Sequence, residues 1–152
     1  KPPRENGRAA RLLAALSLYT GKKEYRLTAR RALESSPLPA PFDVEDAASL
    51  AEGVRAVTGP AVHVVVVADR KDEAAHMLLR EALRTFHPLK RVELLNPEAD
   101  KKRLAELGFP PLPRAVAYVC ARKLCTPPLA NPGELARAIR QAGRGTDGGQ
   151  AR

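Results

Sequence analysis

Two cysteines, Cys120 and Cys125, are the residues of this 152-residue chain whose type and spacing most directly suggest chemistry. A turn at Arg122-Lys123 would make them directly opposed neighbours on two antiparallel strands. Opposed residues reach the short separation that a disulfide needs when they form a non-hydrogen-bonded pair of a hairpin. The two cysteines are therefore candidates for a reversible redox pair, although two small buried apolar residues explain them as well, and this is the preferred interpretation.

The spacing of the cysteines does not match a thiol oxidoreductase or a zinc site. Four residues separate them, whereas a thiol oxidoreductase carries Cys-x-x-Cys at the start of a helix. A structural zinc ion needs four ligands, and His63, His76 and His87 are not spaced as ligands. We therefore expect no metal site and no cofactor.

Polar residues that follow predicted strands form a second group of candidates. Asp69 and Asn96 are candidates for ligand contacts, because the carboxyl ends of the strands are the usual ligand side of an open α/β sheet. Helix capping explains both residues as well and is the preferred interpretation. The turn at 68–72 has no glycine that would let the backbone approach a phosphate. Asn6, which we expect to cap the first helix, is the third candidate, and the sequence shows no complete catalytic site.

The elements that position these residues are organised around the valine run Val62–Ala68. Four consecutive valines leave no polar face, so both faces of this strand should be covered. The other predicted elements of this region are a helix at 73–86, strands at 91–95 and 115–120, a short helix between 96 and 108, a returning strand after the turn, and a last helix from 131. The first two strands should be parallel, because a helix connects them.

Helical spacing of apolar residues dominates the start of the chain. Asn6 caps a predicted helix at 7–19, whose apolar stripe includes Leu12, Leu16 and Tyr19, and Gly21 ends it. A second helix then forms an antiparallel hairpin with the first. A break with three prolines at 37–41 precedes a third helix.

The sequence thus predicts an α/β fold in which helices precede a small sheet. An amino-terminal helical hairpin and a third helix should be followed by a three-stranded, mainly parallel sheet with flanking helices and the cysteine hairpin at its edge. The expected domains are a helical segment at 1–59, a small α/β domain at 60–142 and a disordered tail at 143–152.

The net charge of +9 is unevenly distributed, because residues 1–40 and 101–152 are basic whereas residues 41–100 are acidic. The cations are spread over helices and the tail without interleaved aromatic residues, so nucleic acid is not an expected partner. The chain has no run of about 18 apolar residues that could span a membrane and no signal peptide. We therefore expect a cytoplasmic protein without a membrane partner. The scarcity of Asn and Gln suggests a heat-adapted source.

Several segments together resemble the carboxyl-terminal end of the YyaL-type, spermatogenesis-associated thioredoxin-domain proteins. The segments are Asn6-Gly7-x-Ala9-Ala10, Thr20-Gly21, Glu24-Tyr25, Val64-Val65-Val66-Val67, Phe86-His87-Pro88, Ala117-Tyr118-Val119-Cys120-x-x-x-x-Cys125-x-Pro127-Pro128 and Asn131-Pro132-x-Glu134-Leu135. The resemblance covers about residues 5–142, and the cysteine hairpin is its most specific part.

The resemblance implies that the helical segment at 1–59 is the end of an α/α barrel. Family members have a thioredoxin-like domain, then a barrel similar to sugar epimerases and six-hairpin glycosidases, then a small α/β region. The implied function is a non-catalytic scaffold that closes the barrel, in a protein of undefined activity. Its partner would be the remainder of its own longer chain, or a second copy bound through the helical hairpin. The alternative function is an autonomous basic module that binds anionic partners such as nucleic acid.

Overall fold

The structure of the chain is a computed structural model that describes residues 2–36, 43–122 and 124–142. Three parts of the prediction lie outside the described residues. These parts are the prolines of the expected break at 37–41, Lys123 at the tip of the hairpin, and the expected disordered tail at 143–152.

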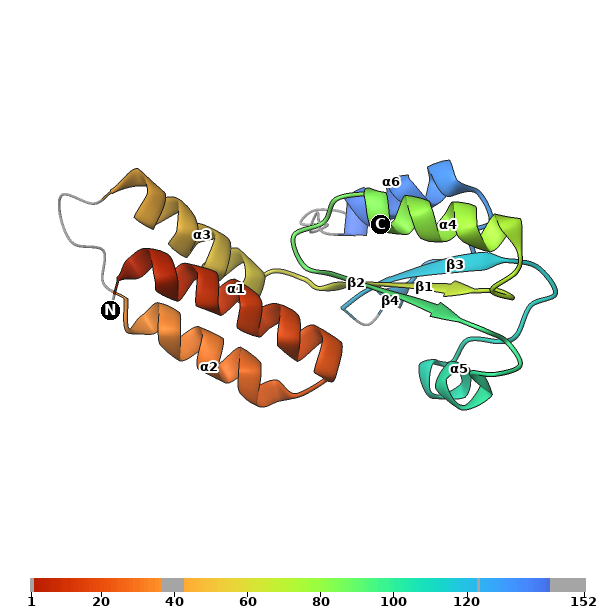
Figure 1. Cartoon of the computed structure of the whole chain (residues 1–152), viewed down its shortest axis with the longest axis horizontal. Helices are drawn as coiled ribbons and strands as arrows, with labels where there is room; N and C mark the ends of the chain where they lie inside the picture. The colour runs from red at the N-terminus through yellow and green to blue at the C-terminus, as the bar shows by residue number, and fades with distance from the viewer. Residues whose placement is uncertain (1, 37–42, 123, 143–152) are drawn as a thin grey trace, which may run out of the picture. The chain divides into compact units, whose positions relative to one another are not determined.

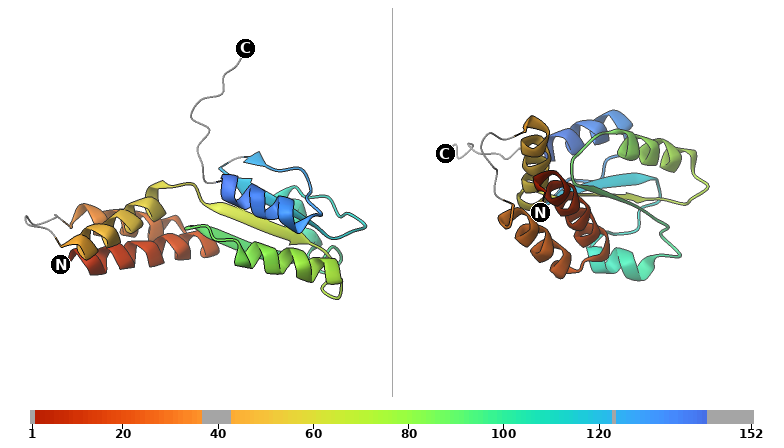
Figure 2. Two further views of the ribbon diagram at one scale, coloured as in Figure 1. Left: turned by 90° about the horizontal axis from the view of Figure 1, so that it is seen from above. Right: turned by 60° about the vertical axis from the view of Figure 1, so that its left-hand side comes forward.

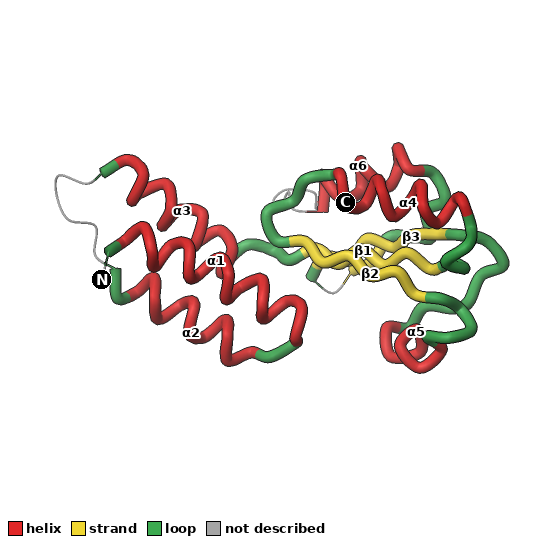
Figure 3. Tube along the Cα trace, viewed as in Figure 1, coloured by secondary structure: helices red, strands yellow, loops and turns green. Residues whose placement is uncertain are grey.

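The chain divides into two compact units, of which Lys1–Ala61 is helical and Val62–Arg152 contains the sheet. The helices of the first unit are α1 (Pro3–Thr20), α2 (Lys23–Glu34) and α3 (Val44–Thr58). Helix α1 contacts both α2 and α3, and it runs antiparallel to α2 (Figures 1 and 3). Gly21, with a φ of 73°, occupies the left-handed position after α1 as predicted.

Helix α1 begins four residues earlier than predicted, at Pro3 instead of Gly7. Proline is favoured at the first helical position, because it has no N–H to leave unpaired and its φ is already helical. Asn6 is therefore not a helix cap, and that prediction is wrong. Its side chain is buried within α1, where Nδ2 donates to the Ser36 hydroxyl just after α2.

Small residues, instead of the predicted leucine stripe, form the buried face of α1. The buried positions are Asn6, Gly7, Ala10 and Ala14. By contrast, Leu12 is 63% exposed and Tyr19 is 55% exposed. The close approach of α1 and α3 explains this difference, because a Cβ on Gly7 would lie 2.3 Å from the carbonyl oxygen of Ser49. Backbones at this separation leave no room for a leucine between them.

The second unit is a four-stranded sheet, within the described residues, with helices on both faces. Its elements are β1 (Val62–Val67), α4 (Glu73–Arg84), β2 (Lys90–Leu95), α5 (Lys101–Leu107), β3 (Val116–Ala121), β4 (Leu124–Cys125) and α6 (Pro132–Ala142). The strand order is β2-β1-β3-β4. The predicted α/β fold is confirmed, and the returning strand of the hairpin joins the sheet as its fourth strand.

The sheet is mixed and not mainly parallel as predicted. Strands β1 and β2 are parallel as expected, but β3 is antiparallel to β1. Val67, at the end of β1, pairs with both Leu95 and Val116. The chain therefore leaves β2 and enters β3 at the same end of the strands. The connection between these strands, residues 96–115, includes the seven-residue helix α5. This connection starts and finishes at the same end of the strands, so β3 runs antiparallel to β1 instead of completing a second parallel crossover.

Helices cover both faces of the central strand, as the valine run predicts. Val62, Val64 and Val66 pack with residues of α4 and α6 in one core cluster. Val65 and Val67 belong to the cluster of the opposite face, which includes residues of α5. Figure 2 shows α4 and α6 together on one side of the sheet and α5 on the other. Burial of each such side chain contributes roughly 1.5–3 kcal/mol.

Candidate functional site

The cysteine hairpin forms the outer edge of the sheet. Cys120 on β3 pairs with Cys125 on β4, and a disulfide joins their sulfur atoms. The next residues outward, Val119 and Thr126, are hydrogen-bonded, since the Thr126 N–H donates to the Val119 carbonyl at 3.0 Å. Hydrogen-bonded and non-hydrogen-bonded pairs alternate along an antiparallel ladder. The cysteines therefore occupy the non-hydrogen-bonded position, where the side chains are closest.

The two cysteines differ in their access to solvent. Cys125 is exposed on the two-residue edge strand, whereas Cys120 is half-buried against the apolar cluster that includes Tyr118. An interpretation as two small buried residues does not describe this pair. At the turn, Arg122 has a φ of 58°, in the left-handed region that non-glycine residues seldom adopt.

One residue from each strand lines up in a row across the sheet. Arg91 pairs with His63, and His63 pairs with Cys120. Cys120 pairs with Cys125 at the end of the row. Paired residues point to the same face, and directly opposed residues of antiparallel strands have Cβ atoms about 4.5–5.5 Å apart. The row therefore places an imidazole beside the disulfide.

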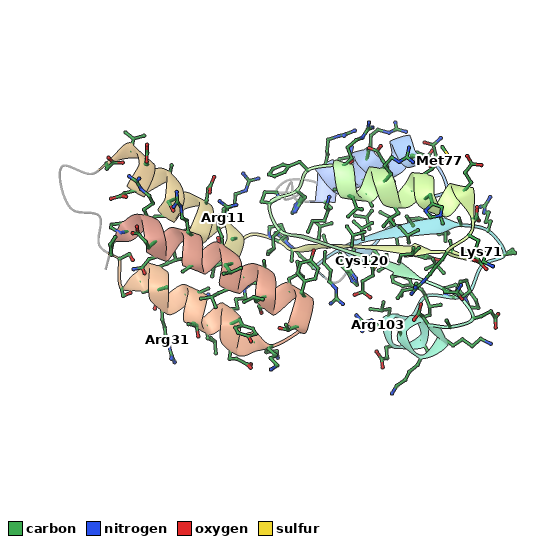
Figure 4. The ribbon with its side chains drawn as sticks, in the orientation of Figure 1. Arg11, Arg31, Lys71, Met77, Arg103 and Cys120 are labelled. Carbon is green, nitrogen blue, oxygen red and sulfur yellow. A yellow bond between two sulfur atoms is a disulfide. The ribbon has the colours of Figure 1, made fainter. Side chains whose placement is uncertain are left out.

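Glu93, two residues after Arg91 on the same strand, gathers the charged side chains of this face. Its Oε1 atom lies 3.1 Å from His63 Nε2 and accepts a hydrogen bond from Arg103 at 3.1 Å. Arg103 Nε donates to the other carboxylate oxygen at 3.3 Å, and Arg91 forms an ion pair with Glu93 as well. Figure 4 labels Arg103 on α5, and Cys120 packs in the cluster of the face that α5 covers.

Burial and charge shift the protonation equilibria of this cluster. Burial lowers the pKa of His63 below its ordinary value; the Glu93 carboxylate opposes this, and Arg91 and Arg103 lower it further. Burial raises the pKa of Glu93, but the hydrogen bond from Arg103 and the charges of Arg91 and His63 lower it by more. At neutral pH, one ionised carboxylate therefore faces two guanidinium groups and a neutral imidazole.

Helix α5 and the residues after it cover the neighbouring part of this face. The Phe109 ring stacks on Tyr118 with ring centroids 4.2 Å apart. Leu104 of α5 packs in the same cluster with Val65 and Val67. This apolar cluster is adjacent to the row of His63 and the cysteines, because Cys120 packs against it. Burial in the cluster raises the pKa of the Tyr118 hydroxyl.

The predicted ligand residues Asp69 and Asn96 lie at the other end of the parallel strands. Asp69 Oδ1 accepts the N–H of Lys71 at 2.9 Å. Asn96 Oδ1 accepts the N–H groups of Glu98 and Ala99 at 2.8 and 3.0 Å. Both side chains stabilise local turns after β1 and β2, and neither is brought together with the cysteine pair. Ligand binding at these residues stays a prediction.

The sequence interpretation missed the group formed by His63, Arg91, Glu93 and Arg103. A signal for part of it was present, because Arg91 and Glu93 are two residues apart in a strand and so point to one face. His63 interrupts the apolar run of the adjacent strand. The contribution of Arg103 depends on where α5 packs, which the local sequence does not define.

Neither a metal-binding group nor a membrane-spanning helix occurs in the part of the chain that the structure describes. No group of three or more His, Cys, Asp or Glu side chains there is placed to hold a metal ion. No described helix is long and apolar enough to cross a bilayer.

The fold and the hairpin define an α/β unit with a disulfide-bonded edge, preceded by a three-helix unit within the described residues. No protein-family model, curated protein or solved structure significantly matches the chain.

Proposed function

We propose that the chain is a non-catalytic scaffold region of a cytoplasmic, YyaL-type thioredoxin-domain protein, and that its helical unit closes an α/α barrel. The supporting observation is the surface of α1 and α2. Leu12, Leu16 and Leu27 are 63%, 37% and 57% exposed on these helices. Leu12 and Leu16 are four residues apart and so lie on one face of α1. Exposed apolar side chains grouped in this way mark an interaction site, and further helices of a barrel would bury them.

The composition of the helical core supports the same proposal. Its buried apolar residues are Ala10, Ala14, Ala29, Leu50, Ala56 and Val57. Alanine buries little apolar area, and the stabilisation from burial scales with that area. Additional helices packed on the exposed leucines would supply the apolar area that this core lacks. The partner in this proposal is the barrel of the same longer chain.

A binding experiment with a recombinant α/α barrel of a YyaL-type protein tests the proposal. The barrel is prepared without its own carboxyl-terminal region and is mixed with this chain, and complexes are detected by size-exclusion chromatography with light scattering. We expect a complex with the wild-type chain and none with the double variant Leu12→Lys, Leu16→Lys. Leu83→Lys is the matched control, because Leu83 is 62% exposed on α4 in the other unit.

The outcomes separate the scaffold from its alternatives. A double variant that binds the barrel as tightly as the wild type contradicts the proposed surface. A wild-type chain that ignores the barrel but forms homo-oligomers through Leu12 and Leu16 replaces the barrel with a second copy as the partner. A chain that stays monomeric and binds neither overturns the proposal.

A further inference from the structure

The disulfide of the cysteine hairpin is asymmetric in a way that suits stepwise exchange. Cys125 is exposed on the edge strand, and Cys120 is half-buried next to His63. Thiol–disulfide exchange depends on which sulfur an attacking thiolate can reach and on how readily the other sulfur leaves. Cys125 is therefore the residue of the pair that a reductant in solvent can approach, whereas Cys120 is half-buried against the apolar cluster that includes Tyr118.

We infer that the Cys120–Cys125 disulfide is a thiol–disulfide exchange site for a dithiol reductant, which attacks Cys125 Sγ while the imidazolium form of His63, where it is populated, delivers a proton to Cys120. This reaction goes beyond the scaffold role and does not depend on it. Cys120, Cys125 and His63 all belong to the unit Val62–Arg152, whereas the proposed barrel surface belongs to Lys1–Ala61.

The surroundings of His63 hold its ring in a defined position. Its Nε2 atom lies 3.1 Å from Glu93 Oε1, on the side of β2. Cys120 lies opposite His63 on the other side, on β3. The imidazole has Glu93 and Arg91 of β2 and Arg103 of α5 as its charged neighbours. On β3 it is opposed by Cys120, and Tyr118 lies two residues further along the same face, opposite Val65. Because opposed residues of antiparallel strands have Cβ atoms about 4.5–5.5 Å apart, the register brings the His63 and Cys120 side chains together on one face, and a proton can pass between them through one water.

The reaction balances with a dithiol as the reductant. A thiolate of the dithiol attacks Cys125 Sγ, a new sulfur–sulfur bond forms, and the bond to Cys120 breaks with its electron pair on Cys120 Sγ. Cys120 takes up a proton from His63, which regains one from the medium that received the proton of the attacking thiol. The second thiolate of the dithiol then attacks the dithiol sulfur bound to Cys125, which closes an intramolecular disulfide in the dithiol and releases Cys125 as a thiolate. Cys125 takes up from the medium the proton that the second thiol lost. The dithiol loses two electrons and two protons, and the two cysteines gain them.

A dithiol is required because the hairpin stays closed after the first step. The Thr126 N–H donates to Val119 at 3.0 Å, independently of the disulfide. Ala117 and Leu129 exchange two backbone hydrogen bonds of 2.8 and 2.9 Å. These bonds keep Cys120 beside Cys125, so Cys120 expels a monothiol and closes the disulfide again. A second thiol within the same reductant competes with this reaction because it is also intramolecular.

Reduction kinetics of the folded chain test the exchange site. The oxidised protein is treated with dithiothreitol or with glutathione at equal thiol concentration, samples are quenched by alkylation, and the thiols are counted by mass spectrometry. We expect complete reduction by dithiothreitol, with unchanged circular dichroism, at least about tenfold faster than by glutathione. A disulfide that resists dithiothreitol until the protein unfolds overturns the exchange site. Equal rates with both reductants overturn the choice of a dithiol.

Variants of the histidines test the proton transfer. The reduction rate at each pH is divided by the fraction of dithiothreitol that is thiolate at that pH. This division removes the pH dependence of the reductant, so the pH dependence that remains comes from the protein. In the wild type this corrected rate should rise as the pH falls through the titration of His63, below 6.5. His63→Gln should abolish this rise and lower the rate by about threefold to tenfold at acidic pH. His76→Gln is the matched control, because His76 is exposed on α4, and it should behave as the wild type.

A second substitution keeps the test informative if His63→Gln is poorly folded. Glu93 raises the pKa of His63, so Glu93→Gln should move the rise in the corrected rate to lower pH. Circular dichroism of each variant establishes that it is folded before its rate is measured. A pH profile that is the same in the wild type, His63→Gln and Glu93→Gln overturns the role of His63.

Discussion

Glu93 is the residue on which the charged side chains of one end of the sheet converge. It is largely buried, and His63, Arg91 and Arg103 all lie within ion-pair distance of it. A buried carboxylate with three such partners is costly to leave unpaired, because its desolvation is no longer compensated. The cluster therefore connects the protonation of His63 to the stability of the α/β unit.

The pKa shifts of this cluster predict how the stability of the protein depends on pH. The folded-state pKa values of His63 and Glu93 lie below the ordinary values of 6.5 and 4.5. Between the folded and ordinary values the unfolded chain binds more protons, so the free energy of unfolding falls as the pH falls. The contribution of His63 is complete above about pH 6.5 and is lost below it, and that of Glu93 is lost at more acidic pH.

Urea unfolding of the wild type and His63→Gln measures the His63 contribution. From about pH 7.5 to about pH 5.5, the free energy of unfolding should fall by more in the wild type than in His63→Gln. His76→Gln, whose side chain is exposed, should follow the wild type. A wild type and a His63→Gln variant with parallel pH profiles would contradict the downward shift of the His63 pKa.

The site shows which residues can be inferred from sequence and which cannot. The opposition of Cys120 and Cys125 follows from counting around a two-residue turn, and the structure pairs these residues as counted. The neighbours across the sheet, His63 and Arg91, follow from the register between strands that are distant in sequence. Register is determined by packing of the whole sheet, so these neighbours could not be read from local spacing.

At the scale of elements, the crossing of α1 and α3 determines how the helical unit packs. Gly7 and Gly53 meet there, since a Cβ on Gly53 would lie 3.0 Å from the Gly7 carbonyl oxygen. Apolar periodicity predicted the helices correctly but predicted the wrong buried face for α1. The leucine stripe is the most hydrophobic face, whereas the smallest face allows the closest approach of two helix backbones.

Gly7→Ala tests this crossing. In most helix interiors, replacing glycine by alanine stabilises the protein by roughly 0.5–1 kcal/mol. Here the new Cβ would lie 2.3 Å from the Ser49 carbonyl oxygen, and backbone cannot move aside as a side chain can. We therefore expect a loss of about 1–3 kcal/mol in the free energy of unfolding of the helical unit, as for overpacked cores.

Chemical denaturation followed by circular dichroism measures the effect of Gly7→Ala. Arg8→Ala is the matched control, because Arg8 is exposed on the same turn of α1 and its replacement should change stability by less than about 0.5 kcal/mol. A Gly7→Ala variant as stable as the wild type, or more stable, would show that α1 and α3 do not approach each other at Gly7.

At the scale of the whole molecule, the net charge of +9 raises the question of anionic partners. Many cations of the described chain have carboxylate neighbours. Besides those at Glu93, ion pairs join Arg4 to Asp43, Glu45 and Asp46, Arg11 to Glu52, Arg84 to Glu81, and Lys101 to Glu98. A phosphate backbone would have to compete with these carboxylates, so the charge should produce weak and nonspecific attraction.

A salt titration separates this attraction from an autonomous binding module. Anisotropy of a fluorescent DNA duplex should show weak binding at about 50 mM salt that is lost by about 200 mM. Replacing Arg30 and Arg31, both exposed on α2, by glutamine should lower the slope of log affinity against log salt by no more than about two. Binding that persists at about 200 mM salt and prefers one sequence would instead support the nucleic-acid module. The scaffold proposal requires that no such binding remain, because it assigns the interaction surface to Leu12 and Leu16 and not to the arginines.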